Sequence, residues 1–103
     1  MRLRDLGELW RLSVRRTESE QSYREFQGFQ ARLLIRYMED HGVRFAGSSL
    51  LDLGSGLGGY SRELAARGAR VVAVDLTQPR IRDAAIRRVR ASGDAVPLRD
   101  GAV

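Results

Sequence analysis

The segment Leu50–Tyr60, which reads LLDLGSGLGGY, constrains the fold of this chain more than any other stretch. It follows a short apolar run, precedes a helical pattern and holds four glycines in the six positions from 54 to 59. A strand, a glycine turn and a helix in this order are typical of turns that cradle a nucleotide-type ligand. Glycine has no Cβ, so the backbone can adopt unusual dihedral angles and approach a ligand closely. We therefore expect a ligand-binding turn rather than a merely tight one.

The glycines fit two patterns with different ligands. Gly54, Gly56 and Gly59 match the G-x-G-x-x-G of dinucleotide binders. Gly54, Gly56 and Gly58 instead match the G-x-G-x-G of another family that binds a nucleoside ligand. Asp75 lies 21 residues after Gly54, where an acidic side chain commonly accepts hydrogen bonds from ribose hydroxyls. Both ligands contain a ribose, so Asp75 does not separate them.

Asp52 separates the two ligands better, because it lies within the expected strand, two residues before Gly54. A carboxylate at the glycine turn would repel a pyrophosphate and attract a ligand that carries an ammonium and a sulfonium. A buried aspartate that only caps local amides is the structural alternative. Asp94 follows the third expected strand and could accept a hydrogen bond from an exocyclic amine. The carboxylates favour a cationic adenosyl ligand.

Hydrophobic periodicity and turn residues predict an alternation of strands and helices after two N-terminal helices. Thr17 is the expected N-cap of the second helix and Gly42 its end, Gly68 ends the helix after the glycine turn, and Thr77 and Pro79 begin the last helix. Strands followed by helices predict βαβ units and a parallel sheet. The predicted helices cover 2–16, 17–42, 59–67 and 77–88, the predicted strands cover 49–53, 70–76 and 89–92, and the domains cover 1–47 and 48–103.

Composition excludes several classes of function. The chain of 103 residues has no cysteine and a single histidine, His41, so neither a disulfide framework nor a metal site is expected. No apolar run is long enough for a membrane span or a signal peptide, which favours a cytoplasmic protein without a membrane partner. All 18 basic residues are arginine and the net charge is +5. Because the arginines are scattered, we attribute them to a GC-rich genome rather than to a nucleic-acid surface.

Three motifs together, LLDLGSGLGG, VVAVDL and GDAVPLRDG, resemble the class I S-adenosylmethionine-dependent methyltransferases, particularly their small-molecule-type group. The resemblance covers about residues 49–103. It implies an α/β fold, a Rossmann-like three-layer sandwich with N-terminal helices on the substrate side. It also implies S-adenosyl-L-methionine as cofactor and a small-molecule or lipid-like methyl acceptor.

The resemblance also implies where the cofactor binds. The glycine turn would line its methionine and ribose portion, with Asp52 on the ammonium side. Asp75 would hold the ribose hydroxyls and Leu76 would pack on the adenine. Asp94 would accept from the adenine amine, beside the Ala95 backbone amide. The expected cofactor-binding residues are Asp52, Gly54, Ser55, Gly56, Gly58, Asp75, Leu76, Asp94 and Ala95; no catalytic base can be named.

The chain departs from the family in length. Family members have a seven-stranded sheet, whereas this sequence ends at Val103, before the fourth strand. We expect an incomplete half-domain of about three parallel strands, from a truncated or split reading frame, with doubtful activity on its own. The strand with Leu50, Leu51 and Leu53 would then form an open sheet edge that invites self-association or a partner chain. An NAD-type dinucleotide-binding fragment and a non-catalytic interaction or RNA-associated remnant are the alternatives.

Overall fold

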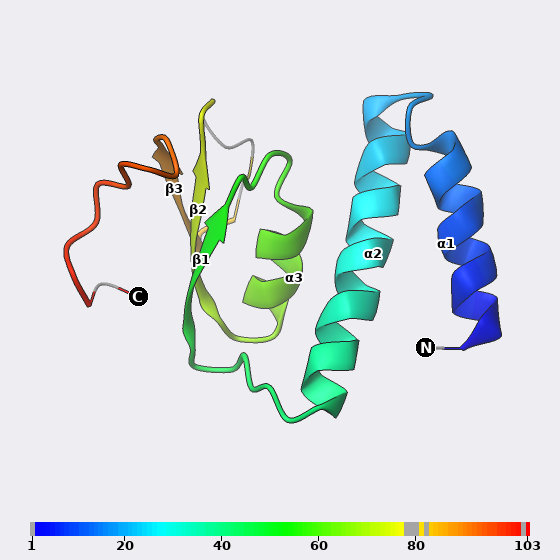
Figure 1. The fold of residues 1–103 in the computed structure, drawn as a ribbon, viewed down its shortest axis with the longest axis horizontal. Coiled ribbons are helices and arrows are strands. Elements are labelled where there is room, and N and C mark those ends of the chain that lie inside the picture. Colours follow the sequence, from blue (N-terminus) through cyan, green and yellow to red (C-terminus); the bar gives the residue numbers. More distant parts are fainter. Residues whose placement is uncertain (1, 78–80, 82, 102) are drawn as a thin grey trace. The chain divides into compact units, whose positions relative to one another are not determined.

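A computed structural model describes residues 2–77, 81, 83–101 and 103 (Figure 1). The chain divides into two compact units, Met1–Val43 and Arg44–Val103. The first contains two helices, and the second contains a three-stranded sheet and one helix. Within the described residues, no helix is both long and apolar enough to cross a bilayer.

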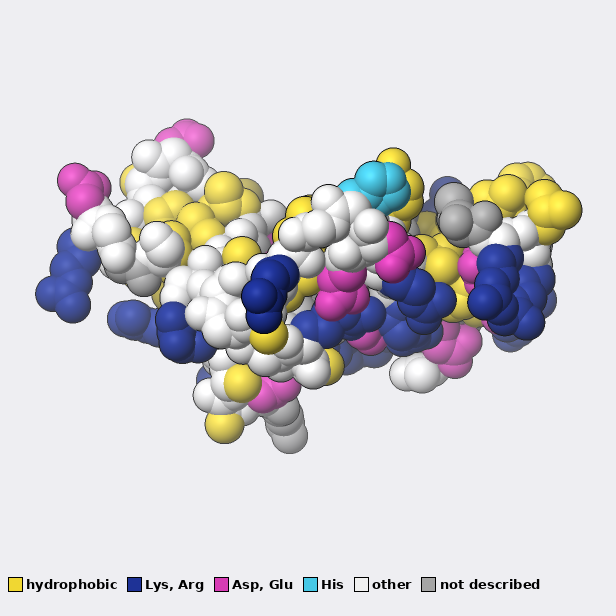
Figure 2. Space-filling model, turned by 90° about the horizontal axis from the view of Figure 1, so that it is seen from below, with side chains coloured by type: hydrophobic (Ala, Val, Ile, Leu, Met, Phe, Trp, Pro, Cys, Tyr) yellow, Lys and Arg dark blue, Asp and Glu magenta, His cyan; other side chains and the backbone are white. Residues whose placement is uncertain are grey.

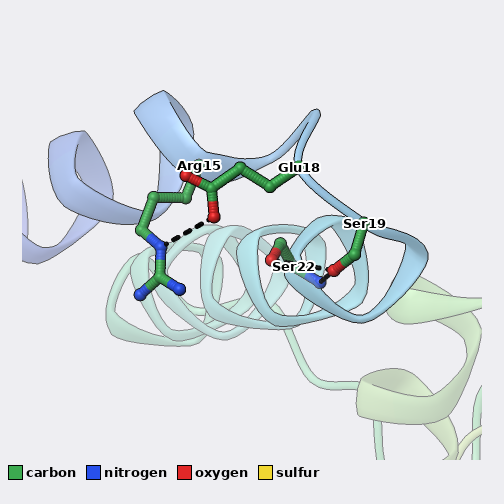
Figure 3. Close-up of polar contacts among 4 residues, drawn as sticks. All are labelled: Arg15, Glu18, Ser19 and Ser22. Carbon is green, nitrogen blue, oxygen red and sulfur yellow. Dashed lines mark hydrogen bonds and ion pairs between the residues drawn. The ribbon is translucent and has the colours of Figure 1, made fainter.

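The first unit is a helical hairpin of α1 (Leu3–Arg15) and α2 (Glu20–Asp40), which pack against each other. Ser19 rather than Thr17 caps α2, so that prediction is wrong. Ser19 has an extended backbone, and its Oγ accepts a hydrogen bond from the Ser22 amide at 3.0 Å (Figure 3). Thr17 instead lies in the turn between the helices, which the Glu18 amide closes by donating to the Arg15 carbonyl. An Arg15–Glu18 ion pair of 3.2 Å spans the same turn.

The end of α2 follows the predicted glycine signal. Gly42 has a φ of +92°, the left-handed conformation that favours glycine after a helix. Its amide donates to the Glu39 carbonyl, and the Val43 amide donates to the Met38 carbonyl, each at 3.0 Å. This pair of bonds is a Schellman motif, which satisfies carbonyls that a helix end would otherwise leave open.

The second unit is built on a parallel sheet of β1 (Ser49–Leu53), β2 (Arg70–Asp75) and β3 (Ile86–Arg90), in the order β1-β2-β3. The helix α3 (Gly59–Ala66) connects β1 to β2, and Gly68 follows it with a φ of +89°. This arrangement confirms the predicted α/β class, the parallel sheet and the first two strands. In the described sheet β1 pairs only with β2, so its other side is an edge. Pairing of that edge with another chain stays a prediction.

The core of the second unit lies on both faces of β2. Asp52 in β1 accepts a hydrogen bond from Ser61 in α3, so α3 covers the face of the sheet on which Asp52 lies. Ala73, the register partner of Asp52 in β2, lies on the same face. Val74 lies on the opposite face and is 1% exposed. The buried apolar side chains of this unit are Phe45, Ala69, Val71, Ala73, Val74, Ile81 and Ile86.

The helix predicted over 77–88 is wrong for the described residues of that segment. Asp83 makes a turn, with its Oδ1 accepting from the Ala85 amide at 2.9 Å and its carbonyl accepting from the Ile86 amide at 3.0 Å. The strand then begins at Ile86, three residues before the predicted start at Val89, because Ile86 and Val89 are β-branched and pack in a sheet. Thr77 lies in a bend, and Pro79 lies outside the described residues.

Gly58 precedes α3 with a φ of +82°, and a Cβ added there would overlap the buried side chain of Ile81. Gly58→Ala should therefore lower the free energy of unfolding by about 2–4 kcal/mol, through backbone strain and overpacking together. Gly54→Ala is the matched control. Its φ is +73°, but an added Cβ meets nothing within 4 Å in the part of the chain that the structure describes.

The Gly54→Ala control should lower the free energy of unfolding only by the backbone strain, about 1–2 kcal/mol. Chemical denaturation followed by circular dichroism measures both variants. Equal losses at the two positions would contradict the packing of Gly58 against Ile81.

Candidate functional site

The glycine turn is held against the end of β2 by backbone hydrogen bonds. The Gly54 and Ser55 amides both donate to the Val74 carbonyl, at 2.8 and 2.9 Å. Gly54 and Gly56 have φ values of +73° and +52°, which residues with a Cβ rarely adopt. The turn can therefore follow β2 closely only because these two positions are glycine.

Asp75 connects the end of β2 to the same turn. Its Oδ2 accepts from the Gly56 amide at 2.8 Å, and its Oδ1 accepts from the Thr77 amide at 3.2 Å. Hydrogen bonds to the charged form, chiefly the one from Gly56 and then the one from Thr77, lower the pKa of the Asp75 carboxyl. The carboxylate is thus held in place by two backbone amides at the carboxyl edge of the sheet.

A pocket of about 190 Å³ opens at this carboxyl edge. Gly54, Asp75 and Leu76 are the predicted site residues that line it. Parallel strands bring their carboxyl ends to one edge, which is where open α/β sheets bind ligands. Residues from the ends of β1 and β2 and from the loops after all three strands line the pocket: Leu53, Gly54, Val74, Asp75, Leu76, Ala91 and Gly93.

Four of these lining residues, Leu53, Val74, Ala91 and Gly93, are missing from the sequence prediction. The signal that could have found them is the strand register, which pairs Leu53 with Val74. Beyond the paired strands, the Ala91 amide donates to the Asp75 carbonyl at 2.9 Å, which carries the chain after β3 alongside Asp75. Only the position of Ala91 depends on where β3 ends, and the sequence placed the start of that strand three residues too late.

Asp52 lies at the base of the turn and does not line the pocket. It is half-buried, and its Oδ2 accepts from the Ser61 hydroxyl at 2.6 Å. Ser61 is fully buried in the first turn of α3. The carboxylate therefore lies near the N-terminal end of a helix, where the peptide dipoles favour a negative charge.

The remaining glycine-turn residues differ in what surrounds them. A Cβ added at Gly54 or Gly56 would meet no atom of the described residues within 4 Å, so both leave space beside this part of the turn. Gly58 instead packs against Ile81. Ser55 is 3% exposed, and its Oγ is buried without a hydrogen-bond partner among the described residues. The open side of the turn is thus at Gly54 and Gly56.

Asp94 and Ala95 lie in the exposed loop after β3. The Asp94 amide donates to Ser92 Oγ at 3.3 Å, and the Ala95 amide donates to the Ser92 carbonyl at 3.1 Å. Neither lines the pocket, although Gly93 beside them does. Their predicted contacts with an adenine stay predictions.

The charged side chains of the described residues do not form a metal site, since no group of three or more histidine or acidic residues could hold an ion there. Figure 2 shows the arginines interspersed with acidic and apolar side chains on the visible face. Several arginines pair with nearby carboxylates, as Arg11 does with Glu8 at 2.6 Å and Arg67 with Glu63 at 3.0 Å.

The lowered pKa of Asp75 predicts a pH dependence of stability. The charged carboxylate is favoured in the folded chain, so its contribution is present above the unfolded pKa of about 3.9. It is lost as the pH falls through the lower, folded pKa. A carbon-detected NMR titration should find the Asp75 carboxyl below its usual pKa, with the Gly56 amide shift following it. An Asp75 carboxyl that titrates at about 3.9 or above would contradict the bond to Gly56.

A protein-family model described as "Methyltransferase domain" matches residues 51–103, just over half of the chain. Neither the curated proteins nor the solved structures include a significant match. The matched segment contains the glycine turn, Asp75 and the loop after β3, which meet at one edge of the sheet. The chain therefore belongs to the methyltransferase-domain family, a family of class I S-adenosylmethionine-dependent methyltransferases.

Proposed function

We propose that the unit Arg44–Val103 binds S-adenosyl-L-methionine at the carboxyl edge of its sheet, for methyl transfer to a small-molecule or lipid-like acceptor. The observation that carries this proposal is the pocket in which Gly54, Asp75 and Leu76 meet. It combines a fixed carboxylate, an open glycine turn and apolar walls, which are the features that a ribose and a purine require.

The size and lining of the pocket suit the nucleoside part of the cofactor. Its volume of about 190 Å³ is below the roughly 300–1,000 Å³ of pockets that enclose a whole drug-sized ligand. Leu53 and Leu76 are 54% and 71% exposed and offer apolar surface to the adenine. Asp75 Oδ2 accepts one amide bond and keeps a further lone pair for a ribose hydroxyl, whereas Oδ1 accepts from both the amide and the hydroxyl of Thr77.

The turn itself suits the methionine part. Open space beside Gly54 and Gly56 lets a ligand reach the backbone. The half-buried Asp52 carboxylate beneath the turn favours a cationic ligand and disfavours a pyrophosphate. These residues fit a ligand with an ammonium group and a neutral ribose.

When bound, the cofactor would supply a methyl group on a sulfonium; an acceptor nucleophile would bond to that methyl carbon in line, with the neutral thioether as leaving group. The contribution of this chain is to orient the nucleoside through Asp75 and to exclude water from its apolar side through Leu53 and Leu76. Positioning of this kind lowers the entropic part of the barrier without a dedicated base.

The chain should bind S-adenosylhomocysteine more tightly than NAD, because only the latter brings a pyrophosphate to the turn above Asp52. Isothermal titration calorimetry of the full chain with each ligand measures the difference. Tighter binding of NAD, or no binding of S-adenosylhomocysteine at millimolar concentration by folded protein, would overturn the proposal.

Asp75→Asn should weaken S-adenosylhomocysteine binding by about tenfold or more, since hydrogen bonds to a charged group contribute about 1.5–3 kcal/mol. Asp100→Asn removes the same charge from an exposed residue that does not line the pocket, and it should leave the affinity unchanged. The same calorimetric titration compares the two variants. An equal effect of both would show that net charge, and not the ribose contact, governs binding.

A further inference from the structure

Ser61 and Asp52 form a close contact at the base of the glycine turn. The Ser61 hydroxyl donates to Asp52 Oδ2 at 2.6 Å, a short distance that is typical of a hydroxyl bonded to a charged oxygen. Ser61 is 0% exposed, so water does not compete for this bond. Asp52 is in β1 and Ser61 in α3, so the bond joins the two elements on either side of the turn.

The bond from Ser61 involves only one of the two carboxylate oxygens of Asp52. Oδ2 is held by Ser61, whereas Oδ1 makes no hydrogen bond to any residue in the described part of the chain. The terminal torsion of an aspartate is broad, so an unbonded carboxylate samples many orientations. The Ser61 bond removes this freedom and fixes the orientation of the oxygen that remains available.

We infer that Ser61 is a positioning residue, which orients the Asp52 carboxylate so that Oδ1 can accept from the ammonium group of the cofactor. This inference rests on the proposed function. A substitution of Ser61 should therefore change the affinity for ligands that have the amino-acid portion of the cofactor and leave unchanged the affinity for ligands that lack it. A role of Ser61 in packing alone would change the affinity for both kinds of ligand together.

The test compares S-adenosylhomocysteine with methylthioadenosine, which has the same nucleoside and sulfur but lacks the amino-acid portion. Calorimetry on the full chain should show that Ser61→Ala weakens S-adenosylhomocysteine binding by about five- to tenfold, the size of one hydrogen bond, and leaves methylthioadenosine unchanged. Asp52→Asn should change the ratio of the affinities for S-adenosylhomocysteine and methylthioadenosine by at least the same factor. Ser61→Thr, which keeps the hydroxyl, should restore the ratio.

A double-mutant cycle separates action through Asp52 from independent action. In the Asp52→Asn background, Ser61→Ala should have no further effect on the ratio of the two affinities. If Ser61→Ala does not fold by circular dichroism, Ser61→Cys takes its place, because it keeps the shape and offers only a weak donor.

Two results would overturn the inference, and they are distinguishable. A folded wild-type chain that binds neither ligand would refute the proposed function and this inference with it. A wild-type chain that binds both ligands, with a ratio unchanged by Ser61→Ala or Ser61→Cys, would refute the positioning role and leave the proposed function standing.

Discussion

The hydrogen bond from the Gly56 amide to the Asp75 carboxylate, 2.8 Å long, is the interaction on which the carboxyl edge of the sheet depends. It joins a turn that follows β1 to the last residue of β2. The Val74 carbonyl reinforces it by accepting two amides of the same turn. Because these bonds need left-handed backbone at Gly54 and Gly56, the glycines and the aspartate form one structural unit. The pocket lies beside this unit.

Two carboxylates lie near this edge and have different surroundings. Asp75 is bonded to the backbone and lines the pocket, whereas Asp52 lies below the turn and is bonded to the side chain of Ser61. The different positions of the two carboxylates suit a ligand with a ribose at one end and a cationic group at the other. A ligand with a pyrophosphate between two nucleosides would bring like charge to the lower carboxylate.

The sequence was sufficient for the elements whose signals are local. Gly42 and Gly68 end helices with positive φ, and the β-branched run of β2 is a strand as expected. The sequence prediction failed for the described residues of 77–88. Thr77 and Pro79 indicated the start of a helix, but the turn at Asp83 and the packing of Ile86 favour a strand. Pairing with β2 is a long-range effect that a local helical pattern does not contain.

The candidate site was predictable to the extent that it is made of motifs. Asp75 and Gly54 were predicted from spacing, and they line the pocket. Leu53, Val74 and Ala91 line it because of strand register, which no motif encodes. Ser61 escaped prediction for a similar reason, since a serine within a helix has no signal until the structure brings it to Asp52.

We propose that an adenosyl ligand binds where the three strands end. Titrating isotopically labelled chain with S-adenosylhomocysteine, and following each backbone amide by NMR, tests it most directly. The largest shift changes should fall on residues 53–56, 74–76 and 91–95, with little change along α1. Changes that spread evenly over the chain, or that concentrate away from these three segments, would contradict it.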